Sequence, residues 1–131
     1  MVRCVTVLRF LAWLVNTSPA ARPELATWNR TFQFTLSGEE PFYVGFIDGR
    51  MECRPGRSLA SNVEFRSTSK DFLGVIVGKM KFERGFSSGS YKIYGSMTDA
   101  VRLMRVVEIA YESHTIIANI ARTALAILTW G

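Results

Sequence analysis

The spacing of apolar residues changes along this chain, and each change predicts a different kind of element. Over residues 2–15 apolar residues recur every three to four positions, which is typical of a helix with one buried face. The residues on this face are Val5, Leu8, Leu11, Ala12 and Val15. The segment is too short to span a bilayer, and Arg9 interrupts it too early for a signal peptide. It therefore predicts an amphipathic first helix.

From residue 31 onward apolar and polar positions alternate, as in strands that bury one face. Four such segments follow one another: TFQFTL (31–36), FYVGFID (42–48), RMECR (50–54) and NVEFR (62–66). Asp48-Gly49, between the second and third segments, is a strong signal for a tight hairpin. Successive strands with one polar face indicate a mainly antiparallel sheet that faces water on one side.

Helical spacing returns in the second half of the chain. Residues 67–80 predict a helix with Thr68 and Ser69 as capping candidates, and residues 90–95 predict a fifth strand. Between them we expect a short bridging turn whose Phe and Met side chains face inward. Residues 96–113 predict the clearest helix, which Ser96 and Asp99 start. Residues 115–130 predict a last helix that is apolar on almost every side.

These elements predict an α+β fold in the order α-β-β-β-β-α-β-α. Its five-stranded, mainly antiparallel sheet would carry helices packed on one face. Residues 1–131 are the length of one domain. Within it we expect the first helix at about 2–15, a core of sheet and helices at about 31–112 and the apolar C-terminal helix at about 115–130.

Composition and charge narrow the function classes. The apolar fraction of 48% suits a globular protein, and Cys4 and Cys53 are too few and too far apart to suggest a zinc site. The net charge is +5, and residues 50–92 hold nine Lys/Arg against four Asp/Glu. Two readings stay open for this excess: a surface that meets anionic lipid or nucleic acid, and a solvated sheet face that happens to be basic.

Several short motifs resemble the sterol-carrier-protein type-two family of lipid-binding domains. They are FYVGFIDGRMECRPG, NVEFRSTSKDFLGVIVGKM and GFSSGSYKIYGSMTDAVRLM, within residues 31–103. The positions that follow the family pattern in order are Asp48, Gly49, Asp71, Phe72, Gly78, Lys79, Phe86, Ser88, Gly89 and Gly95. The resemblance implies a five-stranded sheet packed on helices that enclose an apolar tunnel for sterols, fatty acyl chains or related lipids.

Enzyme chemistry finds little support in the sequence. His114 is the single histidine, and no serine or cysteine can be paired with it from sequence. GFSSG (85–89) matches the pattern of a nucleophile elbow, but it is predicted to follow a helix and begin a strand, which reverses the order that an elbow needs. No phosphate loop, dinucleotide fingerprint or cluster of metal ligands is present. We therefore expect no catalytic residues, no metal and no cofactor.

An apolar tunnel needs apolar walls that accept chains of varied shape, and Phe and Met suit such walls. The predicted ligand-binding residues are Phe46, Phe72, Ile76, Met80, Phe86, Met97, Val101, Met104, Ile116, Ile120 and Leu128. Each is equally compatible with an ordinary core position. The surplus of apolar helix faces over what one sheet face requires favours a cavity. Basic residues of the segment 79–92 would then meet a lipid carboxylate, a phosphate or an anionic membrane at the tunnel mouth.

The leading hypothesis is therefore non-enzymatic binding, and transfer, of sterol, fatty acyl or isoprenoid lipids. The partners expected are the lipid ligand and, transiently, an anionic membrane, but not nucleic acid. The alternative is an interaction module in which the apolar C-terminal helix forms a homodimer and no cavity persists. The chain ends in LTWG rather than a peroxisomal address, and a cytoplasmic location is expected.

Overall fold

The computed structural model describes residues 3–76, 82–113, 120, 123, 124 and 127. Among these residues, five strands form one sheet in the spatial order β3-β2-β1-β4-β5. The strands are β1 (Arg30–Ser37), β2 (Phe42–Ile47), β3 (Arg50–Pro55), β4 (Val63–Thr68) and β5 (Tyr91–Gly95). The predicted α+β class with a sheet and helices is confirmed, and each predicted strand lies within one or two residues of its observed bounds.

The sheet is mixed rather than wholly antiparallel. β1–β2, β2–β3 and β4–β5 are antiparallel pairs, whereas β1 and β4 run parallel with Phe34 opposite Phe65. The segment between β3 and β4 therefore carries the chain from one edge of the sheet to the far side of β1. The Asp48-Gly49 hairpin is confirmed: both residues have positive φ, 54° and 77°, as a type I′ turn requires.

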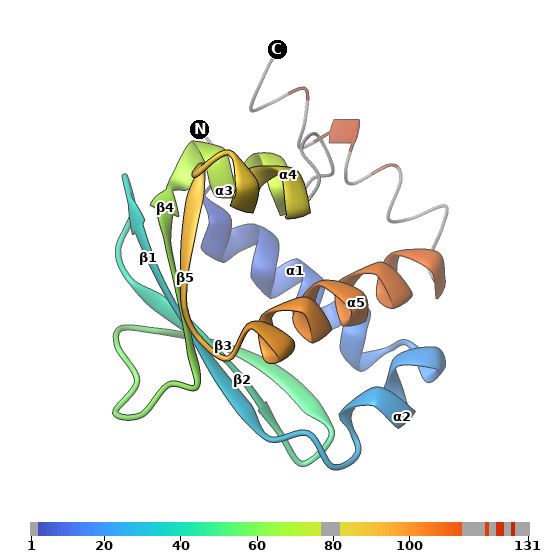
Figure 1. Ribbon diagram of the computed structural model, residues 1–131. Helices are drawn as coiled ribbons and strands as arrows, with labels where there is room; N and C mark the ends of the chain where they lie inside the picture. Colours follow the sequence, from blue (N-terminus) through green and yellow to red (C-terminus); the bar gives the residue numbers. More distant parts are fainter. Residues whose placement is uncertain (1–2, 77–81, 114–119, 121–122, 125–126, 128–131) are drawn as a thin grey trace.

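The helices lie together on one face of this sheet (Figure 1). They are α1 (Cys4–Asn16), α2 (Arg22–Leu25), α3 (Ser69–Ile76), α4 (Phe82–Ser87) and α5 (Met97–Ser113), with a 3-10 turn at Pro19–Ala21 before α2. The predicted caps form: the Thr68 hydroxyl accepts the Asp71 amide at 3.1 Å, and the Ser96 hydroxyl accepts the Asp99 amide at 3.2 Å.

The core is built on the inner face of the sheet, where phenylalanine rings meet α3. Phe34 packs on Phe42, Phe65 and Phe72 with ring centroids 5.0, 5.1 and 5.2 Å away. These rings are all at most 1% exposed. Offset aromatic pairs of this kind stabilise a core beyond the area that they bury. Phe72 thereby anchors α3 to the middle of the sheet.

Two carboxylates fasten helices to the sheet. Glu39, in the β1–β2 turn, accepts the backbone amides of Cys4 (2.9 Å) and Val5 (3.1 Å) at the start of α1, and it also bonds the Ser69 hydroxyl. An acceptor of this kind satisfies donors that the first turn of a helix leaves free. Asp99 on α5 accepts Trp28 Nε1 at 3.1 Å and Arg30 Nε at 2.9 Å. The turn and the strand thus fix where α1 and α5 begin.

The bridging turn expected between residues 78 and 90 is partly wrong. Residues Phe82–Ser87 form the helix α4, and Gly85 is buried within it. Phe86 is 43% exposed, so it does not face inward as expected. A six-residue helix leaves too short a periodic pattern to recognise, and residues 77–81, which precede it, lie outside the described residues.

Gly95 shows why glycine stands between β5 and α5. Its φ is +105°, and a Cβ at this position would lie 2.2 Å from the Asn62 carbonyl oxygen. No other residue fits without a backbone shift. This close approach lets α5 turn back over the sheet directly after β5.

No single helix among the described residues is long and apolar enough to cross a bilayer. The pair Cys4–Asn16 and Pro19–Leu25 reaches that threshold only when taken together, and the pair is bent by 85°.

Candidate functional site

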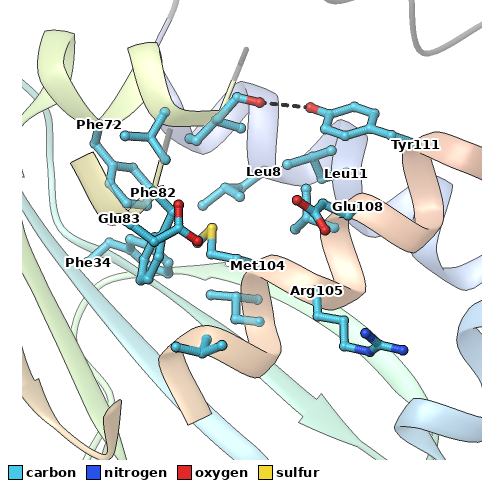
Figure 2. Close-up of a pocket in the computed structure, with 15 residues that line it drawn as sticks. Leu8, Leu11, Phe34, Phe72, Phe82, Glu83, Met104, Arg105, Glu108 and Tyr111 are labelled. Carbon is cyan, nitrogen blue, oxygen red and sulfur yellow. Dashed lines mark hydrogen bonds between the residues drawn. The ribbon is translucent and has the colours of Figure 1, made fainter. Parts of the chain in front are cut away.

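In the described part of the chain, a cavity of about 600 Å³ lies on the helix side of the sheet. Its lining is mainly apolar (Figure 2). The apolar lining residues are Leu8 and Leu11 of α1, Phe34 of β1, Phe72, Val75 and Ile76 of α3, Phe82 of α4, and Val101, Leu103, Met104 and Val107 of α5. Glu83, Arg105, Glu108 and Tyr111 complete the lining. This size and character are typical of a small-molecule pocket.

The walls follow from helical spacing. Phe72, Val75 and Ile76 stand three and four residues apart on α3, so they share one face. Val101, Met104 and Glu108 do the same on α5. Phe34 closes the bottom of the cavity from β1 and packs directly against Phe72. The cavity therefore lies between the inner face of the sheet and the facing sides of α3 and α5.

Tyrosine hydroxyl groups fix the borders of the cavity. Tyr111 near the end of α5 donates to the Ile76 carbonyl at the end of α3, with the oxygens 3.0 Å apart. Tyr91 on β5 donates to the Phe82 carbonyl at the start of α4. Burial, together with the nearby Glu83 charge, raises the pKa of Tyr91, so its hydroxyl stays protonated and remains a donor. Both bonds hold helix ends in place beside a hollow.

The cavity reaches the surface along α4 and α5. Val101 lines it and is 52% exposed, and the charged lining residues Glu83, Arg105 and Glu108 are exposed as well. Arg105 Nε lies 3.7 Å from a carboxylate oxygen of Glu24 on α2. The sequence favoured basic residues of 79–92 at the mouth. Among the described residues of that segment, Phe82 and the acidic Glu83 line the cavity and Arg84 and Lys92 do not, while Lys79 and Lys81 lie outside the described residues.

Four of the predicted site residues line the cavity: Phe72, Ile76, Val101 and Met104. They come from α3 and α5, so the structure brings together residues about thirty positions apart. Their role in binding a ligand stays a prediction.

The other predicted residues lie elsewhere. Phe46 is buried in the core against Trp28 and Phe32, with ring centroids 4.7 and 5.7 Å away, and it is not among the lining residues. Phe86 and Met97 are exposed and do not line the cavity, and Ile120 is 67% exposed. Met80, Ile116 and Leu128 lie outside the described residues.

Sequence reasoning did not select Leu8, Leu11, Phe34, Val75 or Phe82 as lining residues. Leu8 and Leu11 belong to the predicted apolar face of residues 2–15, which by itself does not separate lining residues from core residues. Phe34 was recognised only as an inward strand residue. The alternation of apolar and polar residues does not show whether an inward side chain packs against a neighbour or lines a cavity.

The described serine and cysteine side chains show no sign of enzyme chemistry. Ser87 donates to the Arg84 carbonyl at 3.2 Å, at the end of a helix and before a strand.

Cys4 and Cys53 are free thiols. Burial raises the pKa of Cys4 to about 12 and that of Cys53 to about 11, so both stay protonated at neutral pH. His114 lies outside the described residues. Within the described ranges, no three His, Cys, Asp or Glu side chains gather as metal ligands would.

Known proteins with similar sequences or structures share this fold. The solution structure of the sterol carrier protein domain 2 of Helicoverpa armigera matches with a TM-score of 0.66 at 18% identity, over 80% of this chain and 85% of that one. The solution structure of palmitated SCP2L2 from Aedes aegypti matches with a TM-score of 0.63 at 17% identity, over 81% and 95%.

A relative by sequence is hydroxysteroid dehydrogenase-like protein 2 of Xenopus tropicalis, which is 34% identical over 79 residues. The match covers 58% of this chain and 19% of the relative, so the chain corresponds to about a fifth of that protein. The model of the SCP-2 sterol transfer family matches residues 11–108, which include all five strands and most of α5. The chain belongs to the SCP-2 sterol transfer family.

Proposed function

We propose that this chain binds one apolar lipid in the cavity between α3 and α5, without catalysing a reaction on it. The supporting observation is the cavity itself: about 600 Å³, lined mainly by aliphatic and aromatic side chains, within the fold of a lipid-carrier family. The apolar tunnel expected from the sequence is then this cavity, which a lipid enters from the exposed side at Val101.

Binding in such a site draws on burial of hydrocarbon. Each methylene moved from water into the cavity contributes roughly 0.8 kcal/mol, so a long chain gains affinity with little help from polar groups. Met104 and the phenylalanines suit this task, because methionine side chains adapt to ligands of different shape. Fatty acyl, sterol and isoprenoid lipids all meet these requirements.

The similar protein from Aedes aegypti was solved in a palmitated form, which supports a long hydrocarbon chain as ligand for a protein of this fold. We extend this to a carrier role, in which the chain takes up a lipid at one membrane and releases it at another. Transient contact with an anionic membrane and a cytoplasmic location stay predictions under this proposal.

A titration with a pyrene-labelled long-chain lipid tests the binding step. Saturable fluorescence with a stoichiometry near one lipid per chain is expected, and native mass spectrometry of gently extracted protein should show the matching added mass. Repeated absence of both signals would refute the proposal. Exchange of the same lipid between donor and acceptor vesicles tests transfer separately.

The alternative, a dimerisation module, rests on the apolar segment 115–130, of which the structure describes only positions 120, 123, 124 and 127. Ile120 and Ile127 are 67% and 63% exposed, which is the observation that favours an interaction surface there. Deleting residues 115–131 separates the two functions. Loss of a dimer with lipid binding intact supports the module, and loss of lipid binding in a monomer supports a segment that covers the cavity.

A further inference from the structure

The charged side chains of the cavity lining include two carboxylates, which a binding site for an anion would not place beside its ligand. Carboxylates of Glu83 on α4 and Glu108 on α5 both belong to its lining, and Figure 2 shows both within the ring of apolar side chains. In the part of the chain that the structure describes, neither carboxylate forms an ion pair or a hydrogen bond. Two hydrogen-bond acceptors with negative charge thus face the space that a lipid would enter.

Arg105 and Tyr111 carry the side-chain donors of the described lining. The Arg105 guanidinium points away from the cavity in Figure 2, toward α2, where its Nε lies 3.7 Å from Glu24. The Tyr111 hydroxyl donates its proton to the Ile76 carbonyl. A ligand with a negative polar end would therefore meet two carboxylates, while Arg105, the one cation of the described lining, points toward Glu24.

We propose that the cavity selects lipids that end in an uncharged hydroxyl group over lipids that end in a carboxylate. This inference rests on the proposed lipid binding and adds the class of polar end group. A hydroxyl donates to Glu83 or Glu108, whereas a carboxylate offers no proton and is repelled by both. The hydrocarbon part of either lipid gains the same contacts with α3 and α5, so the end group decides between them.

Two probes that differ only at this end test the selection: pyrenyl-dodecanol and pyrenyl-dodecanoic acid, titrated into the full chain at neutral pH and low salt. The alcohol should bind about tenfold more tightly, which corresponds to about 1.4 kcal/mol of repulsion from partly solvated carboxylates. In the double variant Glu83→Gln, Glu108→Gln, affinity for the acid should rise about tenfold, and affinity for the alcohol should stay within about threefold.

Glu40→Gln is the matched control, because Glu40 is exposed in the β1–β2 turn and does not line the cavity. It removes one negative charge and should leave both affinities unchanged. Both glutamates of the cavity are exposed, so the double variant is expected to fold, which circular dichroism checks.

Equal binding of the two probes by the unmodified chain, or tighter binding of the acid, contradicts the selection while lipid binding stands. If the acid binds more tightly and the variant Lys79→Gln, Lys81→Gln loses this preference, the lysines bind the carboxylate end of the lipid instead. An unchanged affinity for the acid in the variant Glu83→Gln, Glu108→Gln also contradicts the proposed selection. If neither probe binds, the proposed function itself fails and the selection fails with it.

Discussion

Val101 is an apolar residue at the place where the cavity meets solvent. It lines the hollow and is half exposed, so a larger side chain there has room to turn inward without displacing the core. Met97, one turn earlier on α5, is also exposed but does not line the cavity. Substitutions at these two positions therefore distinguish an effect on ligand binding from an effect on folding.

Val101→Trp should lower lipid affinity by more than about tenfold, because excluding even two methylenes from burial costs about 1.6 kcal/mol. Met97→Trp should leave the affinity within about twofold and serves as the control. Fluorescence titration of both variants with the same labelled lipid measures the difference. Equal effects of the two substitutions would place the ligand elsewhere.

Asp99 carries a prediction about pH. Burial alone raises the pKa of Asp99, but hydrogen bonds from Trp28 and Arg30, the Arg30 charge and the Ser96 hydroxyl outweigh it, and the net pKa lies below the ordinary value. The folded state therefore binds this proton more weakly than the unfolded chain does. The stabilisation is complete above about pH 3.9, the unfolded value, and is lost as the pH falls from there through the folded pKa.

Asp99→Asn should lower the free energy of unfolding by roughly 2 kcal/mol at neutral pH, because it removes the charge from two hydrogen bonds to a buried acceptor. The loss should shrink when both proteins are unfolded in denaturant at acidic pH, below about 3.9. A difference that stays constant down to strongly acidic pH would show that the carboxylate charge is not what stabilises this contact.

At the scale of elements, Glu39 joins three segments that are distant in sequence. It accepts two amides of α1 and the Ser69 hydroxyl of α3 from a turn between two strands. Since α1 and α3 both contribute to the cavity wall, this carboxylate determines how the two helices are placed beside each other. Its neighbour Glu40 is exposed and forms no such contact.

Glu39→Gln should destabilise the fold by about 1 to 2 kcal/mol, since the two amide bonds and the hydroxyl bond lose their charged acceptor. Amide hydrogens in the first turn of α1 should exchange faster, because they open without global unfolding. Hydrogen exchange read by mass spectrometry reports this, with Glu40→Gln as the control. Unchanged protection of residues 4–8 would contradict a capping role for Glu39.

Elements with long, regular patterns could be predicted from the sequence, and short ones could not. Strand β1 forms where apolar Phe32, Phe34 and Leu36 alternate with polar residues. Two helices begin at the predicted capping residues, and the side chains of Thr68 and Ser96 do cap them. α4 was missed because six residues hold fewer than two helical turns. The parallel β1–β4 pairing was missed because strand alternation says which face is buried but not which neighbour a strand takes.

The candidate site shows the same limit. Phe72, Ile76, Val101 and Met104 could be selected because helix periodicity points them inward. Phe46 points inward too, yet Trp28 from the segment before β1 packs onto it. Whether an inward side chain meets a neighbour or a hollow depends on tertiary packing of distant segments, which a local pattern does not contain.

At the scale of the whole molecule, the described parts of the sheet and the helices leave a cavity that their side chains do not fill. Phe34 and Phe72 make a solid floor on the sheet, while α3 and α5 stay apart and are joined at one end by the Tyr111–Ile76 hydrogen bond. The proposed carrier role would use this combination, with the packed rings supporting the fold and the cavity receiving the hydrocarbon chain.

Photo-crosslinking measures directly where the lipid lies. A long-chain alcohol with a diazirine in its hydrocarbon part would be bound to the full chain, irradiated and mapped by peptide mass spectrometry. Labels should fall on α3 and α5, at residues such as Ile76, Val101 and Met104, and should disappear in Val101→Trp. Labels confined to the outer face of the sheet, or a complete absence of saturable labelling, would contradict lipid binding in this cavity.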